Sequence, residues 1–190
     1  QWLFYARDIN NRLNATDIQE FTVQSAGGNN APTVSEIQPA ISPQSITESG
    51  VTNVTITFLA TDVDGVADLD DTSARANITT PGNSARSNNS CGLVGDINST
   101  TANYSCTLPI HYFDAPGNWT LTVFVADATG TSNKNTTNFT LQSTLAVIIG
   151  PSSLAFSSIS PGATNTTANN DPITVNNTGN QNVTTGNIRL

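Results

Sequence analysis

Basic residues are scarce in this sequence. Lysine and arginine number 6 against 14 aspartates and glutamates, which gives a formal net charge of −8 over 190 residues. Nucleic acids and anionic lipid surfaces bind clustered lysine and arginine, so the composition argues against both as partners. Apolar runs are also short. The run at residues 145–149 is far below the ~18 residues that suggest a membrane-spanning helix, and it predicts a strand instead.

Few side chains could carry catalysis. His111 is the only histidine, and no serine or cysteine near it suggests a nucleophile–base pair, so we expect a structural histidine and no enzyme. The only lysine, Lys134, lies in a predicted loop, whereas an intramolecular lysine–asparagine cross-link needs a buried lysine. No leader peptide is recognisable at Gln1, so we expect a mature or excised segment.

The sequence has two cysteines, Cys91 and Cys106. Without histidines beside them they cannot form a tetrahedral zinc site. An even pair in an acidic, surface-like chain favours a disulfide instead. The bridge would close a loop of about 15 residues and stabilise the fold by roughly 3 kcal/mol.

Uncharged polar residues dominate the chain. Threonine, asparagine and serine make up 71 of 190 residues, a bias that favours strands and turns over helices. Asn-X-Ser/Thr sequons occur twelve times, and a chain this rich in these residues forms several by chance. Five of them share parity with the polar side of the predicted strands, where a glycan needs to be: Asn53, Asn77, Asn103, Asn118 and Asn138. We therefore expect an extracellular glycoprotein, with N-linked glycans at sites among Asn14, Asn53, Asn77, Asn88, Asn98, Asn103, Asn118, Asn135, Asn138, Asn165, Asn176 and Asn182.

The clearest strand covers residues 118–127. Its apolar residues, from Trp119 to Val125, alternate with polar ones, which is the period of a half-buried strand. Turn sequences flank it, and a second strand at residues 136–142 has Phe139 and Leu141 on its apolar side. Together they predict a β-hairpin that closes a β-sandwich. Because Trp119 and Trp2 fall on inward positions, we expect core packing for both rather than sugar stacking.

Residues 32–142 predict one complete antiparallel β-sandwich of the immunoglobulin-like kind, with seven short strands and a turn signal between each. The expected strands cover residues 33–38, 52–61, 73–80, a short piece near Cys91, 103–110, 118–127 and 136–142. The expected core consists of Val54, Ile56, Phe58, Ala60, Ala76, Ile78, Tyr104, Cys106, Leu108, Trp119, Leu121, Val123, Phe139 and Leu141.

Two stretches of this domain resemble a known class of repeats. Y-F-D-A-P-G-N-W at residues 112–119, leading into T-L-T-V-F-V-A-D-A-T-G, and A-T-D-V-D-G at residues 60–65 resemble strands of PKD-like and related immunoglobulin-like repeats. Such repeats occur in archaeal and bacterial cell-surface proteins. P-I-T-V-N-N-T-G-N at residues 172–180 likewise looks like the second strand of archaeal surface β-sandwich repeats. The resemblance implies an all-β fold of tandem sandwiches.

The flanking segments read as parts of further sandwiches. E-F-T-V-Q at residues 20–24 is similar to N-F-T-L-Q at residues 138–142, 118 positions later, so residues 1–24 are expected to be the closing strand pair of a preceding domain. Residues 25–31 are expected to be a flexible linker, and residues 143–190 the opening strands of a following sandwich. These cover a strand at 145–149, a strand followed by a turn in 154–162, a strand followed by a tight turn in 172–180, and the start of another strand at 187–190. Two explanations remain open: excision from a longer repeat protein, or β-strand addition between copies in a homopolymer.

Acidic residues concentrate in residues 62–71, which hold five of the 14. Carboxylates at alternate positions beside a glycine suit an oxygen-ligated cation such as Ca²⁺, although the spacing departs from an EF-hand. In an immunoglobulin-like topology the loop after residue 127 lies at the same end. We therefore expect either a solvated acidic turn or a calcium site formed by Asp62, Asp64, Asp68 and Asp127. Apart from glycans, Ca²⁺ is the one cofactor that the sequence suggests.

These expectations favour a non-enzymatic structural protein of the cell surface, as a glycosylated repeat of a surface layer, stalk or filament. The alternative is an adhesin-type module that binds a glycan or protein partner. Exposed aromatic residues gathered on one loop cluster would favour the adhesin, and we expect none.

Overall fold

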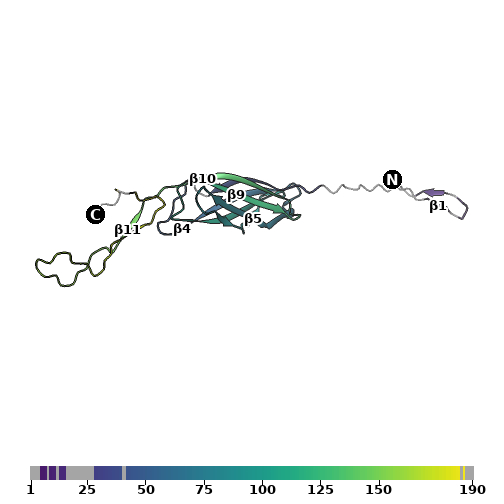
Figure 1. The fold of residues 1–190 in the computed structure, drawn as a ribbon. Helices are drawn as coiled ribbons and strands as arrows, with labels where there is room; N and C mark the ends of the chain where they lie inside the picture. Colours follow the sequence, from purple (N-terminus) through teal and green to yellow (C-terminus); the bar gives the residue numbers. More distant parts are fainter. Residues whose placement is uncertain are drawn as a thin grey trace.

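The computed structural model describes residues 5–7, 9–11, 13–15, 28–39, 42–184 and 186. In these residues the chain is all-β, and its one helical element is the single-turn 3-10 helix η1 (Val66–Asp68). Two four-stranded antiparallel sheets form a β-sandwich, and two short hairpins lie outside it (Figure 1). The strands are β1 (Tyr5–Arg7), β2 (Leu13–Ala15), β3 (Thr33–Pro39), β4 (Val51–Thr61), β5 (Leu69–Thr79), β6 (Arg86–Asn88), β7 (Gly92–Asp96), β8 (Thr101–His111), β9 (Gly117–Asp127), β10 (Ser132–Leu141), β11 (Val147–Gly150) and β12 (Thr174–Asn177).

The sandwich consists of strands β3 to β10. One sheet has the order β3-β4-β8-β7, and the other has the order β10-β9-β5-β6. Short β-propensity segments with polar turns between them explain the antiparallel pairing. Just after β3, Gln44 makes a parallel bridge to Leu141 of β10, so this segment joins the edge of the other sheet.

The core lies between the inner faces of the two sheets. In β4 the buried side chains Val54, Ile56 and Phe58 alternate with outward polar residues, and β9 has the same pattern from Trp119 to Val125, except that the outward residue Phe124 is apolar. All fourteen residues expected in the core are buried. Trp119 is fully buried and its indole N–H donates to the carbonyl oxygen of Ala115 at 2.9 Å, so its one polar atom is satisfied.

The strand positions expected between residues 32 and 142 are largely reproduced, with one strand missed. The structure has two short strands, β6 and β7, where one was expected near Cys91. Residues 86–88 have no apolar alternation, so their sequence does not predict a strand. The side chain of Arg86 forms an ion pair with Asp114 instead of packing in the core. In addition, β5 begins four residues earlier and β10 four residues earlier than expected (Leu69 against 73, and Ser132 against 136).

Two expectations outside the sandwich are wrong. Strand β2 pairs with β1 within residues that were assigned to a turn, while the expected partner at residues 17–24 lies outside the described residues. Residues 154–162 form no strand. Instead, the Asn170 side chain makes hydrogen bonds to the backbone of residues 153 and 155, and the backbone N–H of Asn169 donates to the carbonyl of Ala155. The apolar residues there remain exposed, as they do on β11.

The chain enters and leaves the sandwich at opposite ends (Figure 1). Residue 28 joins the end formed by the β4–β5 and β9–β10 loops, where Asn29 bonds Asp127. At the other end, the hairpin β11–β12 attaches through the turn at Gly179, since Ser49 donates to the carbonyl of Thr178 and Asn180 donates to that of Gln142. No helix in the described residues is long and apolar enough to cross a membrane.

Candidate metal centre

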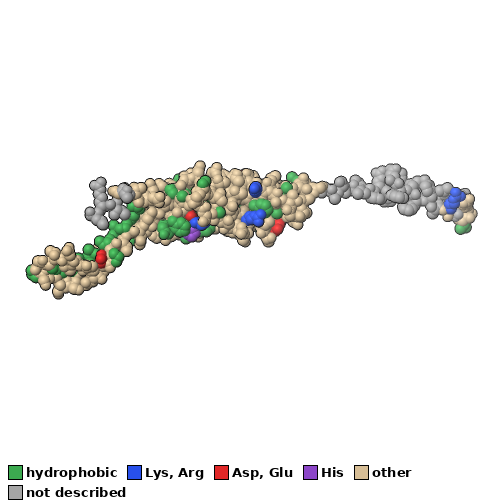
Figure 2. Space-filling view, viewed as in Figure 1, with side chains coloured by type: hydrophobic (Ala, Val, Ile, Leu, Met, Phe, Trp, Pro, Cys, Tyr) green, Lys and Arg blue, Asp and Glu red, His purple; other side chains and the backbone are tan. Residues whose placement is uncertain are grey.

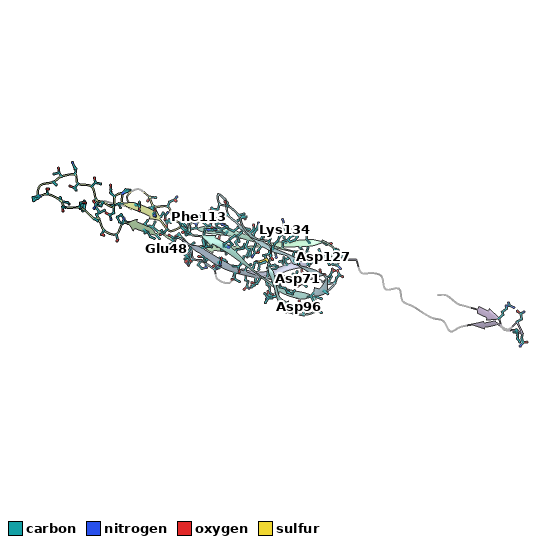
Figure 3. All side chains as sticks on the ribbon, turned by 90° about the horizontal axis from the view of Figure 1, so that it is seen from below. Glu48, Asp71, Asp96, Phe113, Asp127 and Lys134 are labelled. Carbon is teal, nitrogen blue, oxygen red and sulfur yellow. A yellow bond between two sulfur atoms is a disulfide. The ribbon has the colours of Figure 1, made fainter. Side chains whose placement is uncertain are left out.

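Three loops and the incoming chain meet at one end of the sandwich. They are residues 62–68 between β4 and β5, residues 97–100 between β7 and β8, residues 128–131 between β9 and β10, and the segment that starts at residue 28. Figure 3 shows Asp127 at this end and Phe113 and Glu48 toward the other. Carboxylates from the first of these loops and from the end of β9 gather here.

Asp62 begins the first loop and is fixed by its backbone. Its N–H donates to the carbonyl of Thr100 at 2.8 Å, and Val66 donates to the carbonyl of Ser99 at 3.0 Å, so the loop is fastened to its neighbour. Gly65 has φ 112°, a conformation that side chains disfavour, and it lets the chain turn into η1. Asp62 Oδ1 accepts the N–H of Asp64 at 2.9 Å, whereas Oδ2 is buried with no hydrogen-bond partner.

Asp127 ends β9 and organises the next turn. Its Oδ1 accepts the N–H groups of Thr129 and Thr131 and the Thr129 hydroxyl, all between 2.8 and 2.9 Å. Its Oδ2 accepts the side-chain N–H of Asn29 at 2.8 Å. Burial by itself would raise the pKa of Asp127, but these hydrogen bonds from Asn29, Thr129 and Thr131 outweigh it, so the pKa is lowered and the carboxylate stays ionised.

Asp68 completes the group. One carboxylate oxygen from each of Asp62, Asp68 and Asp127 lies within 4.8 Å of the others. Asp68 Oδ2, like Asp62 Oδ2, is buried without a partner. Desolvation raises the pKa of Asp68, and the negative charges of Asp127, Asp62 and Asp64 raise it further. Three acids at this separation repel one another, so the end of the sandwich is electrostatically unfavourable as it stands.

The incoming segment lies against the carboxylates. Besides Asp127, the Asn29 side-chain N–H also reaches the Thr131 hydroxyl at 3.1 Å. Asn30 donates from its backbone N–H and its side-chain N–H to Asp64 Oδ2, at 2.7 and 3.2 Å. A hollow of about 390 Å³, open to solvent, is lined by Asn29, Asp64, Ala67 and Asp68.

Of the four acids that the sequence grouped, the structure brings Asp62, Asp68 and Asp127 together. Asp64 is not in this group, and its carboxylate accepts hydrogen bonds from Asn30. Asn29 and Asn30 were placed in a flexible linker, although both contact the acidic loops. Only their position just before Pro32, at the start of the sandwich, could have indicated this.

The two cysteines form the disulfide Cys91–Cys106, the pairing expected from the sequence. Cys91 lies just before β7 and Cys106 on the adjacent β8, and both are buried in the core. The Cys91 N–H donates to the carbonyl of Ala74 on β5 at 2.9 Å, so this point is joined to both sheets.

None of the eleven sequon asparagines whose side chains are described is buried; Asn14 lies outside them. Exposed ones are Asn53, Asn98, Asn118, Asn135, Asn138, Asn165, Asn176 and Asn182, and Asn77, Asn88 and Asn103 are half-buried. Two use the nitrogen to which a glycan attaches: Asn88 donates it to the carbonyl of Thr107 and Asn135 to that of Val34, at 2.9 and 2.8 Å.

An exposed aromatic cluster, which was not expected, occupies the β8–β9 turn. The Phe113 ring stacks on His111 with centroids 5.1 Å apart and meets Tyr112 edge-on at 5.2 Å. Phe113 is 59% exposed, and Figure 2 shows apolar surface beside the single histidine. His111 thus contributes to a surface as well as to the end of β8. Trp2 lies outside the described residues.

A second hollow, of about 320 Å³, lies on the outer face of the β10-β9-β5-β6 sheet. Arg75 lies over the ring of Phe124, 3.8 Å from its centroid, and exposed Lys134 lines the same hollow.

Comparisons of the chain with protein-family models, with curated proteins and with solved structures found no match.

Proposed function

We propose that the chain is a non-enzymatic structural segment of an extracellular surface protein, built as a glycosylated rigid unit in a surface layer, stalk or filament. The observation that carries this proposal is the path of the chain, which enters the sandwich beside Asp127 and leaves it at the opposite end beside Gln142. Units connected in this way lie end to end and transmit tension along their strands.

The sandwich itself belongs to the immunoglobulin-like class in this proposal. Its sheet orders, β3-β4-β8-β7 and β10-β9-β5-β6, correspond to the A-B-E-D and G-F-C-C′ arrangement of that class. The parallel bridge between Gln44 and Leu141 corresponds to a first strand that changes sheets. This assignment supports a tandem array of similar units.

Chemistry of the surface supports an extracellular setting. The disulfide between Cys91 and Cys106 persists in oxidising compartments, and the sequon asparagines with described side chains are accessible. Glycans on both outer sheet faces would block edge-to-edge association of the strands.

Neighbouring units of the same kind are the partners in this proposal. The hairpin β11–β12 exposes Val147, Ile148, Ile149 and Val175, and among the described residues no further strand pairs with either edge. Such a ribbon gains stability when further strands are added to it, so we propose that it joins strands of an adjacent unit.

The test uses intact cells of the source organism. Brief protease treatment should remove the protein from the cell surface, and negative-stain images of the released or native material should show regular polymers or lattices. Recovery of the protein intact and monomeric from the soluble cell interior would contradict the proposal.

A binding module is the second candidate, and the cluster at Phe113 favours it. At this turn the Phe113 ring stacks on His111 and meets Tyr112 edge-on, and such a gathering of rings is the feature expected of a sugar-binding surface. Glycan-array binding that is lost in Phe113→Ala, but kept in the sheet-face variant Phe124→Ala, would support an adhesin. Absence of binding by the wild-type chain would leave the structural role as the better account.

A further inference from the structure

The carboxylates at the entry end of the sandwich have no cationic partner in the part of the chain that the structure describes. Among the described residues, the one side-chain ion pair joins Arg86 to Asp114, and it does not reach the cluster. Asp62 is fully buried and Asp127 is 1% exposed. A buried carboxylate that lacks a positive counterpart is costly, so the cluster calls for a cation or a shared proton.

Two oxygens show where such a partner would bind. Asp62 Oδ2 and Asp68 Oδ2 are both buried and unpartnered, although the other oxygen of Asp62 is bonded within its loop. The same two side chains and Asp127 bring one oxygen each to within 4.8 Å of one another. The unsatisfied atoms therefore belong to the one place where three carboxylates converge.

We propose that Asp62, Asp68 and Asp127 bind one Ca²⁺ ion at this position. The donors are oxygens alone, without histidine or cysteine, which suits a hard cation and excludes the usual zinc ligand sets. Ca²⁺ accepts irregular arrangements of six to eight oxygens, whereas Mg²⁺ demands a near-ideal octahedron. The hollow beside Asp68 leaves room for water molecules to complete the shell.

The ion would also hold the incoming chain. Asn29 lies over the cluster and bonds Asp127 Oδ2 through its amide nitrogen. A rotation of that amide by half a turn would present its oxygen to the ion, which is a ligand type that Ca²⁺ uses. Asn30, anchored to Asp64, keeps the segment in place. Calcium binding therefore fixes the direction from which residues 28–32 enter the sandwich.

The experiment compares the chain freed of metal by a chelator with the same chain after addition of Ca²⁺. At 10 mM Ca²⁺, with affinity in the 10⁻⁴–10⁻³ M range of extracellular modules, the unfolding midpoint should rise by about 5 °C. Amide hydrogen exchange of residues 28–31 should slow in parallel. An equal rise with Mg²⁺, or with sodium chloride of equal ionic strength, would show general screening and would overturn the proposal, as would no rise.

Variants locate the site. Asp68→Asn keeps the shape of the side chain and leaves the turn bonds of Asp127 intact, and it should abolish the calcium-dependent rise. Asp62→Asn retains the oxygen that accepts the Asp64 N–H and should do the same, so either variant suffices if the other fails to fold. The control Asp96→Asn, on exposed β7, should respond like the wild type. A full response in a folded Asp68→Asn or Asp62→Asn chain would contradict this assignment.

This inference does not rest on the surface-protein proposal. Calcium binding is measured on the isolated chain, whereas location and assembly are measured on cells, so either can fail alone.

Discussion

Arg86 and Asp114 form a two-pronged ion pair across the sandwich edge. Arg86 Nε donates to Asp114 Oδ2 at 3.2 Å, and Arg86 Nη2 donates to Oδ1. Asp114 is 1% exposed and also accepts the N–H of His111 at 2.7 Å. The ion pair thereby connects the short strand β6 to the turn before β9. Neither Arg86 nor Asp114 could make this connection by apolar packing.

We predict that Asp114→Ala lowers the free energy of unfolding by about 3 kcal/mol, because it leaves the Arg86 guanidinium half-buried and the His111 N–H unpaired. Urea denaturation measures this through a lower midpoint at unchanged slope. The control is Glu48→Ala, an exposed acid, which should cost less than about 0.5 kcal/mol. Equal costs for the two variants would mean that the ion pair does not hold the turn.

Reduction of the disulfide should destabilise the fold without abolishing it. Cys91 and Cys106 close a loop of 15 residues, for which the chain-entropy model gives about 3 kcal/mol. Chemical denaturation with and without reductant measures the loss. The double variant Cys91→Ala and Cys106→Ala should show a similar loss and no further response to reductant. A reductant effect that persists in the double variant would show that the bridge is not its cause.

Gly179→Ala should detach the hairpin β11–β12 from the sandwich. A Cβ at residue 179 would clash with the carbonyl oxygen of Thr144 and would lie 2.9 Å from the backbone nitrogen of Ala146, so the backbone must move. Amide exchange should quicken by about tenfold or more at Ser49, whose N–H bonds the Thr178 carbonyl across this joint, and at Thr178, whose N–H bonds the carbonyl of Ala146, while the sandwich keeps its stability.

The matched control is Gly92→Ala in β7, where an added Cβ meets nothing within 4 Å. It should leave exchange at Thr178 unchanged. Slow exchange at Thr178 in the Gly179→Ala chain would mean that the joint tolerates the methyl group and is looser than described.

The sequons should differ in glycan occupancy, depending on whether the side-chain nitrogen of the asparagine already donates a hydrogen bond. Asn118 and Asn138 are exposed and give their nitrogens to no described partner, so we predict high occupancy. Asn88 and Asn135 donate theirs to backbone carbonyls and should be modified less. Quantitative glycopeptide mapping tests the order, and higher occupancy at Asn135 than at Asn138 would contradict it.

The sequence predicted the sandwich where apolar alternation is long. Residues 54–60 in β4 and 119–125 in β9 have an apolar side chain at every second position, so one register buries that set and the core could be named residue by residue. Strand β6 was missed because a contact 28 residues away, to Asp114, holds it. Local pattern contains no information about such a pairing.

The candidate metal centre was predictable only in part for a similar reason. The density of aspartates in residues 62–71 pointed to Asp62 and Asp68, and topology added Asp127. Which acids lie in the group depends on hydrogen bonds from segments distant in sequence. Asn30 of the incoming segment, for example, donates to the carboxylate of Asp64. The aromatic cluster at Phe113 depends on how a turn projects side chains, which no alternation predicts.

The most direct test of the central claim is peptide mass spectrometry of the native protein, with thiols blocked before digestion, before and after chemical removal of glycans. An extracellular structural unit predicts glycans on the peptides that contain Asn53, Asn118 and Asn138, and a linked pair of peptides containing Cys91 and Cys106. Recovery of those asparagines unmodified, together with two blocked free thiols, would contradict it.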